Sequence, residues 1–268
     1  MTGFFFFALF FPSFPFFFVG PVIGGFLVEA YGIQFTYYGV SLAVLGIAAL
    51  NRLILRETFV PSPNSSPRKN PFSEAFRSWK KLVRDYAPLR DTLFLNWAYW
   101  ITLAGGQFTL LPLLMLDLDL GASQIGLSFA AMSVVTVLSG QPLAYFADKY
   151  GKQTMLGLAS VMLTAGMVSL SYASSFSTLL LALVPMAMGS TSLSSLPLAY
   201  LSDIVKPHER PQAISLLRFV GDVGFLCGAG LAGIMSQATS IGFTLQSNTI
   251  FIGAGISFFM LRRFRERT

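Results

Sequence analysis

Charge is scarce in this sequence, and that scarcity bounds the class of protein. Only 11% of the 268 residues are charged, whereas 54% are hydrophobic. A soluble domain usually carries about 25% charged residues, so a surface this poor in charge would not stay solvated in water. The composition therefore predicts a membrane protein, and its 27 phenylalanines suit contact with lipid.

Cysteine and histidine are also nearly absent, since each occurs once, as Cys227 and His208. A single cysteine excludes an intramolecular disulfide framework, and the pair is too few to form a zinc site of cysteine and histidine ligands. The sequence contains no G-x-x-x-x-G-K loop for ATP, no histidine cluster and no nucleophile motif in its apolar stretches. We therefore expect no enzyme activity, no catalytic residue, no metal and no bound cofactor.

Eight stretches are long and apolar enough to cross a bilayer, which takes about 20 mainly apolar residues for a helix. They are approximately Phe5–Val28, Thr36–Leu55, Thr92–Leu116, Ile125–Phe146, Thr154–Tyr172, Ser177–Leu201, Ala213–Met235 and Gln246–Leu261. The predicted fold class is an all-α membrane protein with about eight transmembrane helices.

The basic residues occupy every second connection between these spans. Apart from Arg218, they lie between Arg52 and Arg90, after the fourth span, after the sixth span and at the C-terminus. The alternate connections contain none. By the positive-inside rule, the basic connections and the C-terminus are predicted to be cytoplasmic. The net charge of +6 is therefore a topology signal, and it predicts a lipid bilayer rather than nucleic acid as partner.

The segment 57–91 divides the chain into residues 1–56, with two spans, and residues 92–268, with six. Apolar side chains recur in it at helical spacing, and basic side chains occupy the other faces: Phe72, Phe76, Trp79, Val83 and Tyr86 against Arg77, Lys80, Lys81 and Arg84. Two interpretations stay open. The segment forms a basic amphipathic helix on the cytoplasmic membrane surface, or it forms a linker helix packed on the bundle.

Three short patterns stand at the ends of spans. The first span contains Gly20-Pro21-Val22-Ile23-Gly24-Gly25, where glycines let helices approach and proline removes a ladder hydrogen bond. The connection after the fourth span reads Ala144-Tyr145-Phe146-Ala147-Asp148-Lys149-Tyr150-Gly151-Lys152. The connection before the seventh span runs from Leu198 to Arg210 and carries Asp203 and Arg210.

A fourth pattern, Arg218-Phe219-Val220-Gly221-Asp222-Val223-Gly224, brings two charges into the interior of a predicted span. Arg218 and Asp222 are four residues apart and share one helical face. A charged Asp at mid-bilayer costs roughly 2.5–3.5 kcal/mol on insertion scales, which indicates a partner or a use. Asp222 is either a protonatable group lining a pathway or a structural charge held by Arg218.

With two spans, a long basic loop and six more spans, these patterns resemble the major facilitator superfamily, of the drug:proton antiporter type, lacking its first four helices. The resemblance implies that Gly20, Pro21, Gly24 and Gly25 end the glycine-proline motif of the fifth helix, which seals against proton leak. Phe7 and Phe16 stand where upstream glycines of that motif would fall.

The same resemblance implies roles for the two loop patterns. Asp148, Lys149, Gly151 and Lys152 match the signature loop between the eighth and ninth helices, whose charge contacts favour the outward-open state. The family pattern begins with glycine where this chain has Ala144. Asp203 and Arg210 match the cytoplasmic loop before the eleventh helix, and Arg218 and Asp222 match the start of that helix in some drug antiporters.

Polar and aromatic side chains inside the third span offer a further candidate site. Asn96, Gln107 and, on the fourth span, Gln141 are polar, while Trp97, Tyr99 and Trp100 crowd one turn. The aromatics form either an interfacial belt or the lining of a cavity for an apolar or cationic substrate.

The first 19 residues carry no resemblance to the family. Residues 4–18 are mostly phenylalanine, as codons rich in pyrimidines would encode, and the resemblance begins at Gly20. We hypothesise that residues 1–19 are translated intron or a gene-model artefact, against the alternative of a genuine phenylalanine-rich helix.

The predicted function is a multi-pass secondary transporter that exports small organic molecules in exchange for protons by alternating access. A central cavity needs both halves, so we expect the chain to be inactive by itself and to need a complementary N-terminal half. The alternative is a non-transporting membrane protein, receptor-like or regulatory. The sequence names neither the substrate nor the membrane.

Overall fold

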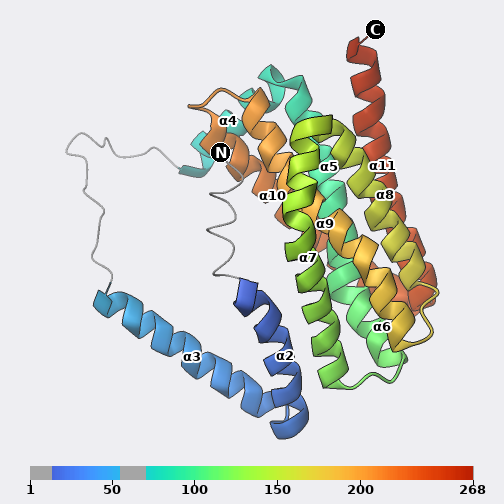
Figure 1. Ribbon diagram of the computed structural model, residues 1–268. Coiled ribbons are helices and arrows are strands. Elements are labelled where there is room, and N and C mark those ends of the chain that lie inside the picture. The colour runs from blue at the N-terminus through green and yellow to red at the C-terminus, as the bar shows by residue number, and fades with distance from the viewer. Residues whose placement is uncertain (1–13, 55–70, 268) are drawn as a thin grey trace.

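The structure, a computed structural model, describes residues 14–54 and 71–267, and every element in these ranges is a helix (Figure 1). They are α2 (Phe14–Tyr31), α3 (Ile33–Ile54), α4 (Pro71–Asp85), α5 (Ala87–Leu103), the π-helix η1 (Ala104–Leu110), α6 (Leu111–Asp117), α7 (Ala122–Tyr150), α8 (Lys152–Leu170), α9 (Phe176–Ile204), α10 (Arg210–Ala238) and α11 (Ile241–Arg267). The predicted all-α class is confirmed.

Seven helices in the described ranges are long and apolar enough to cross a membrane, with α5, η1 and α6 counted as one span. They correspond to the second to eighth predicted spans. The first predicted span corresponds to α2, whose described part starts at Phe14. The hypothesis of an artefact at residues 1–19 falls mainly on residues 1–13, which lie outside the described residues.

Turn chemistry explains how consecutive spans join tightly. Gly151 ends α7 and starts α8 with a φ of +91°, a backbone conformation that glycine adopts without the steric cost of a side chain. Ser175 precedes α9, and its hydroxyl accepts a hydrogen bond from the Thr178 amide at 3.3 Å. Pro88 and Pro211 occupy first-turn positions of α5 and α10, where no hydrogen bond is lost.

The helix α5 lies at the centre of the bundle and forms hydrogen bonds with three neighbouring helices. The Asn96 side-chain amide donates to the Leu217 carbonyl of α10 at 2.9 Å. The Tyr99 hydroxyl lies 3.0 Å from the Ser190 hydroxyl of α9. The backbone carbonyl of Thr102 accepts from the Asn248 side chain of α11 at 2.7 Å. These contacts matter because lipid supplies little hydrophobic drive for helices to associate.

Small residues of α10 let its backbone approach α5 closely. Gly221 packs on the Trp100 ring, Gly224 on the Trp97 carbonyl, and Gly228 on the Ile101 backbone. These glycines recur every three or four residues, so they form one stripe along the helix. The stripe lets α5 approach this face of α10.

The basic connections gather at one end of the bundle, which we call the basic end. Ion pairs join Lys152 after α7 to Asp203 of α9, Lys81 of α4 to Glu209 before α10, and Arg262 of α11 to Asp91 of α5. Figure 1 shows α4 and the C-terminal end of α11 at this same end, whereas the α2–α3 connection lies at the other.

The glycine stripe yields a direct stability test. We expect Gly228→Ala to lower the free energy of unfolding by roughly 1–3 kcal/mol, because a methyl group would collide with the Ile101 backbone and separate α10 from α5. Gly230→Ala is the matched control on the same helix, since no described residue lies within 4 Å of its added methyl group. Thermal unfolding in detergent measures both, and equal stability of the two variants would contradict this packing.

Candidate transport site

The contact between α2 and α7 joins the two segments that the basic loop separates. A methyl group on Gly25 would lie 2.7 Å from the Ala122 carbonyl oxygen, and Gly126 faces the Pro21 carbonyl at comparably close range. The Glu29 carboxylate accepts a hydrogen bond from the Ser123 amide at 3.2 Å, in the first turn of α7. A carboxylate there also interacts favourably with the helix dipole.

The four residues of the predicted glycine-proline motif therefore differ in their surroundings. Pro21 and Gly25 lie in the α2–α7 contact, whereas a methyl group on Gly20 or Gly24 would have no neighbour within 4 Å in the described part of the chain. Gly20 is exposed, whereas Gly24 and Gly25 are both half-buried, so the close approach to α7 and not solvent accessibility distinguishes Gly25 from Gly24. The predicted role in sealing against proton leak stays a prediction.

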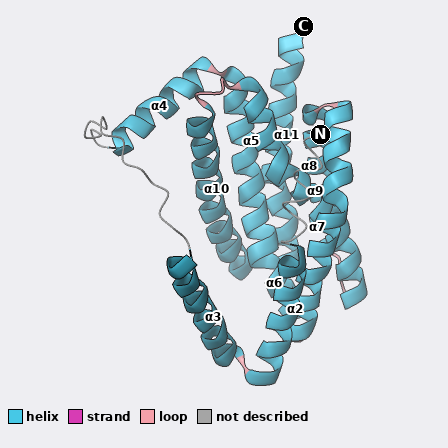
Figure 2. Ribbon diagram, turned by 60° about the vertical axis from the view of Figure 1, so that its left-hand side comes forward, coloured by secondary structure: helices cyan, strands magenta, loops and turns pink. Residues whose placement is uncertain are grey.

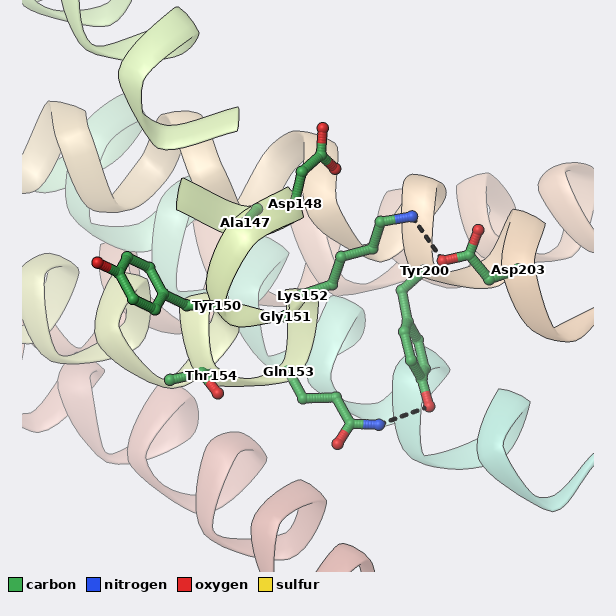
Figure 3. Close-up of a pocket in the computed structure, with 9 residues that line it drawn as sticks. All are labelled: Ala147, Asp148, Tyr150, Gly151, Lys152, Gln153, Thr154, Tyr200 and Asp203. Carbon is green, nitrogen blue, oxygen red and sulfur yellow. Dashed lines mark hydrogen bonds and ion pairs between the residues drawn. The ribbon is translucent and has the colours of Figure 1, made fainter. Parts of the chain in front are cut away.

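The two predicted loop patterns meet at the basic end. The Lys152 ammonium lies 2.5 Å from the Asp203 carboxylate and donates to the Ala199 carbonyl at 3.2 Å. Figure 3 shows Lys152 extending toward Asp203 across a shallow pocket of about 390 Å³, beside the hydrogen bond from Gln153 to Tyr200. The α7–α8 connection is thus tied to the end of α9.

The other residues of these patterns take no part in that ion pair. Asp148 is exposed on the pocket rim, and the Lys149 ammonium lies 5.3 Å from the centre of the Tyr150 ring. Arg210 is exposed and donates from its Nε to the Val205 carbonyl at 3.4 Å. Gly151 supplies the turn described above. The sequence patterns place these residues in two loops but do not indicate that Lys152 pairs with Asp203.

A second polar cluster at the basic end centres on Glu209. Its carboxylate accepts a hydrogen bond from the Tyr86 hydroxyl at 2.7 Å and pairs with Lys81 at 3.4 Å. The hydrogen bond from Tyr86 holds the pKa of Glu209 below its usual value, and the Lys81 charge acts in the same direction. The same hydrogen bond raises the pKa of Tyr86. This cluster fastens the α4–α5 junction to the start of α10.

Sequence analysis missed the pair of Asp91 and Arg262. Asp91 is fully buried at the start of α5, and its carboxylate accepts a hydrogen bond from Arg262 at 3.1 Å. The centre of the Phe258 ring lies 5.2 Å from the guanidinium carbon, and Phe94 packs edge-on against Phe258. The sequence holds a signal for this pair. Asp91 stands directly before the third predicted span, and Arg262 stands directly after the last one, so both are predicted at the same side of the membrane.

Arg218 and Asp222 both lie on the exposed side of α10, and the structure places no ion pair between them within its described residues. Asp222 is the thirteenth residue of the helix, about 18 Å along its axis at 1.5 Å per residue. The interpretation that Arg218 holds this carboxylate therefore has no contact to support it. The interpretation as a protonatable group stays a prediction.

The aromatic side chains of the third predicted span divide between packing and exposure. Tyr99 is buried and bonded to α9, so it belongs to neither an interfacial belt nor a cavity wall. Trp97 stacks on Phe94 with ring centres 5.9 Å apart, and Trp100 packs on Gly221. Both indoles are half-buried.

The π-helix η1 holds a polar group that packing has not satisfied. The side-chain oxygen of Gln107 is buried without a hydrogen-bond partner among the described residues. Gly105 lies against the Asn248 side chain and Gly106 against Met167, contacts that larger residues would block. Turns of π-helix occur often at functional sites. Gln141, by contrast, is exposed. No group of three or more potential metal ligands occurs in the described residues.

Comparisons with known proteins identify relatives of this chain. A family model for the Major Facilitator Superfamily matches residues 104–268. An uncharacterized MFS-type transporter of Methanocaldococcus jannaschii is 22% identical over 238 residues, which cover 87% of this chain and 59% of that protein. Quinolone resistance protein NorA of Staphylococcus aureus is 23% identical over 129 residues, 48% of this chain and 33% of NorA. The chain thus spans about 59% or less of the length of these relatives.

The α2–α7 contact gives a testable expectation for the segment before the basic loop. Gly25→Ala should weaken this contact, because its methyl group meets the Ala122 carbonyl, whereas Gly24→Ala should leave it intact. Disulfide cross-linking reports the contact in a Cys227→Ser background that carries Glu29→Cys and Ser123→Cys. A lower cross-linking yield with Gly25→Ala alone is expected, and an equal yield from both glycine variants would show that α2 does not dock here.

The Glu209 cluster predicts a dependence of stability on pH. Because the folded protein lowers the pKa of Glu209, its stabilisation is complete above the ordinary Glu pKa of about 4.3 and disappears as pH falls through the lowered value. We expect Glu209→Gln to melt below the unchanged protein at pH 7 and the gap to close as pH falls below about 4.3. A gap of constant size across this range would contradict the assigned hydrogen bond.

Proposed function

Because this chain belongs to the major facilitator superfamily, we propose that it works in a proton-coupled exporter of small organic molecules. It is an integral, multi-pass membrane protein of a transporter family. The proposal adds the direction of transport, the coupling ion and the substrate class. It also assigns the basic end to the cytoplasm, in keeping with the alternation of basic connections.

The exposed carboxylate of Asp222 carries the proposal of proton coupling. It lies deep within a membrane-spanning helix, and no described cation neutralises it. Ionised, such a group costs several kcal/mol in hydrocarbon, and protonation removes much of that cost. A protonated Asp222 would therefore favour a conformation in which this helix faces hydrocarbon, and an ionised Asp222 would favour one in which it faces water. Such a difference between two conformations couples proton binding to a conformational change.

Alternating access needs two bodies that move relative to each other. The residues from Ala87 onward form one such body, because α5 bonds to α9, α10 and α11, and ion pairs close its basic end. The segment before the basic loop contacts this body through α2 and α7, and its α3 contains no buried residue. We assign the α2–α7 contact as the pivot.

The substrate class is proposed from similarity, in agreement with the exposed aromatic side chains. NorA is named for quinolone resistance, and quinolones are small, planar and aromatic. Phe108 of η1 is 53% exposed and packs against Phe225 of α10, with ring centres 5.3 Å apart. Together with the half-buried Trp100, these rings offer stacking surfaces for an aromatic substrate. We propose that the rings of Phe108, Phe225 and Trp100 line the transport pathway, beside Gln107, which directly precedes Phe108 in the chain.

Flux measurements on proteoliposomes test the proposal with a quinolone as probe. A pH gradient should drive accumulation, and Asp222→Asn should abolish the dependence on the gradient because it removes the titratable group. Exchange of labelled for unlabelled quinolone without a gradient should survive in that variant, since it needs no proton. Arg218→Gln is the matched control on the same helical face and should keep the gradient dependence.

Two results would overturn parts of this proposal. If Asp222→Asn keeps full dependence on the pH gradient, Asp222 does not carry the proton. If neither gradient-driven uptake nor exchange occurs with the complete protein, export of quinolone-like molecules is wrong as the substrate class.

A further inference from the structure

The helix α4 is fixed to the bundle along one side only. Leu82 is 3% exposed, and Trp79, Val83 and Tyr86 pack with it against the ends of α9 and α10. The rings of Trp79 and Phe219 lie 5.1 Å apart. Figure 2 shows α4 leaving the bundle at an angle, and Phe76, one turn before Trp79, is 60% exposed. The side of α4 that carries Leu82 therefore packs on the bundle, as one of the two interpretations of the sequence expects.

The remaining two sides of α4 differ in chemistry. At about 100° per residue, Phe76, Lys80, Arg84 and Arg77 follow one another around the helix next to the packed side, and all four are exposed. The opposite flank carries Glu74, Ser78 and Asp85. Lys81 lies between these flanks and pairs with Glu209. The helix thus has a packed side, a basic side with an exposed phenylalanine, and an acidic side.

The depth of α4 along α10 places its basic side at a membrane interface. Lys81 contacts Glu209 at the cap of α10, and Trp79 contacts Phe219, ten residues further on and about 15 Å along the axis. The 29 residues of α10 extend about 43 Å, whereas the hydrocarbon core is about 30 Å thick. The first turns of α10 therefore lie among headgroups, and α4 lies level with them.

We propose that Lys80, Arg84 and Arg77 bind the phosphate of an anionic phospholipid in the leaflet at the basic end, with Phe76 against its acyl chains. A shallow hollow of about 390 Å³ lies among these basic side chains and Lys81, with Asp85 at its rim. The arginines offer forked donors for phosphate oxygens, and the neighbouring Trp79 is an aromatic residue of the kind that favours the interface. This site does not depend on what the protein transports.

A lipid fits this side better than a soluble anion does. Phe76 and Lys80 are four residues apart and lie on one face, so the exposed ring and the charge meet the same ligand. An acidic peptide or a free phosphate would use the charges and leave the ring in water. Because α4 is tied through Glu209 and Trp79 to the start of α10, lipid binding would reach the helix that carries Asp222.

Native mass spectrometry of the purified full chain in detergent tests the site, with phosphatidylglycerol and phosphatidylcholine as probes. Each basic side chain near an anionic surface contributes a factor of about five, so Lys80→Gln/Arg84→Gln should lose roughly 30-fold in affinity for phosphatidylglycerol and little for phosphatidylcholine. The control Lys149→Gln/Lys206→Gln removes two exposed charges at the same end and should keep the preference. Thermal unfolding confirms that each variant is folded.

Two further arms separate a lipid from other anions. Phe76→Ala should weaken binding of phosphatidylglycerol, whereas inorganic phosphate at equal concentration should not displace the lipid. Equal affinity for the two lipids, an equal loss in both double variants, or displacement by inorganic phosphate or an acidic peptide would overturn the proposal. A headgroup preference that survives Lys80→Gln/Arg84→Gln would place the lipid elsewhere and overturn it as well.

Discussion

Hydrogen bonds and close backbone contacts join α5 to α9, α10 and α11. A helix in lipid gains little from burying apolar side chains, so close packing and interhelical hydrogen bonds must hold a bundle together. Asn96, Tyr99 and Thr102 stand on one face at successive turns, and each bonds to a different helix. The glycines of α10 bring its backbone against the same helix. The helix continues into η1, where the register changes and the Gln107 oxygen lacks a described partner.

Charge contacts complete this framework at the basic end. The ion pairs of Lys81, Lys152 and Arg262 hold α4 to the start of α10, α8 to α9, and α11 to α5 at this end. The opposite end has the α2–α7 contact, with Glu29 beside the first turn of α7. A body closed at one end, which meets the preceding segment through α2 and α7 at the other end, is suited to movement about that contact. The lipid site proposed on α4 would act on the closed end.

Much of the fold followed from the sequence, because membrane-spanning helices are encoded by length and composition. The spans, the alternation of basic connections and the helix at α4 all depend on local patterns, and the structure agrees with them. Side-chain partners depend on how helices are arranged, which local patterns do not specify. The sequence therefore does not indicate that Glu209 bonds to Tyr86. It places Asp91 at the boundary of a loop, although the structure buries this residue. Tyr99 was assigned to a belt or a cavity because the sequence shows that it is aromatic and not which helix faces it.

Buried amide contacts of α5, rather than apolar composition, hold the six spans from Ala87 onward together. The free energy of unfolding of Asn96→Ala/Asn248→Ala in a bilayer tests it most directly, with Gln141→Ala, an exposed amide on α7, as reference. Interhelical hydrogen bonds in membranes contribute about 0.6 kcal/mol on average and up to about 1.7 kcal/mol. We expect the double variant to lose roughly 1–3 kcal/mol of its free energy of unfolding and Gln141→Ala to lose almost none. An equally small loss in both would contradict it.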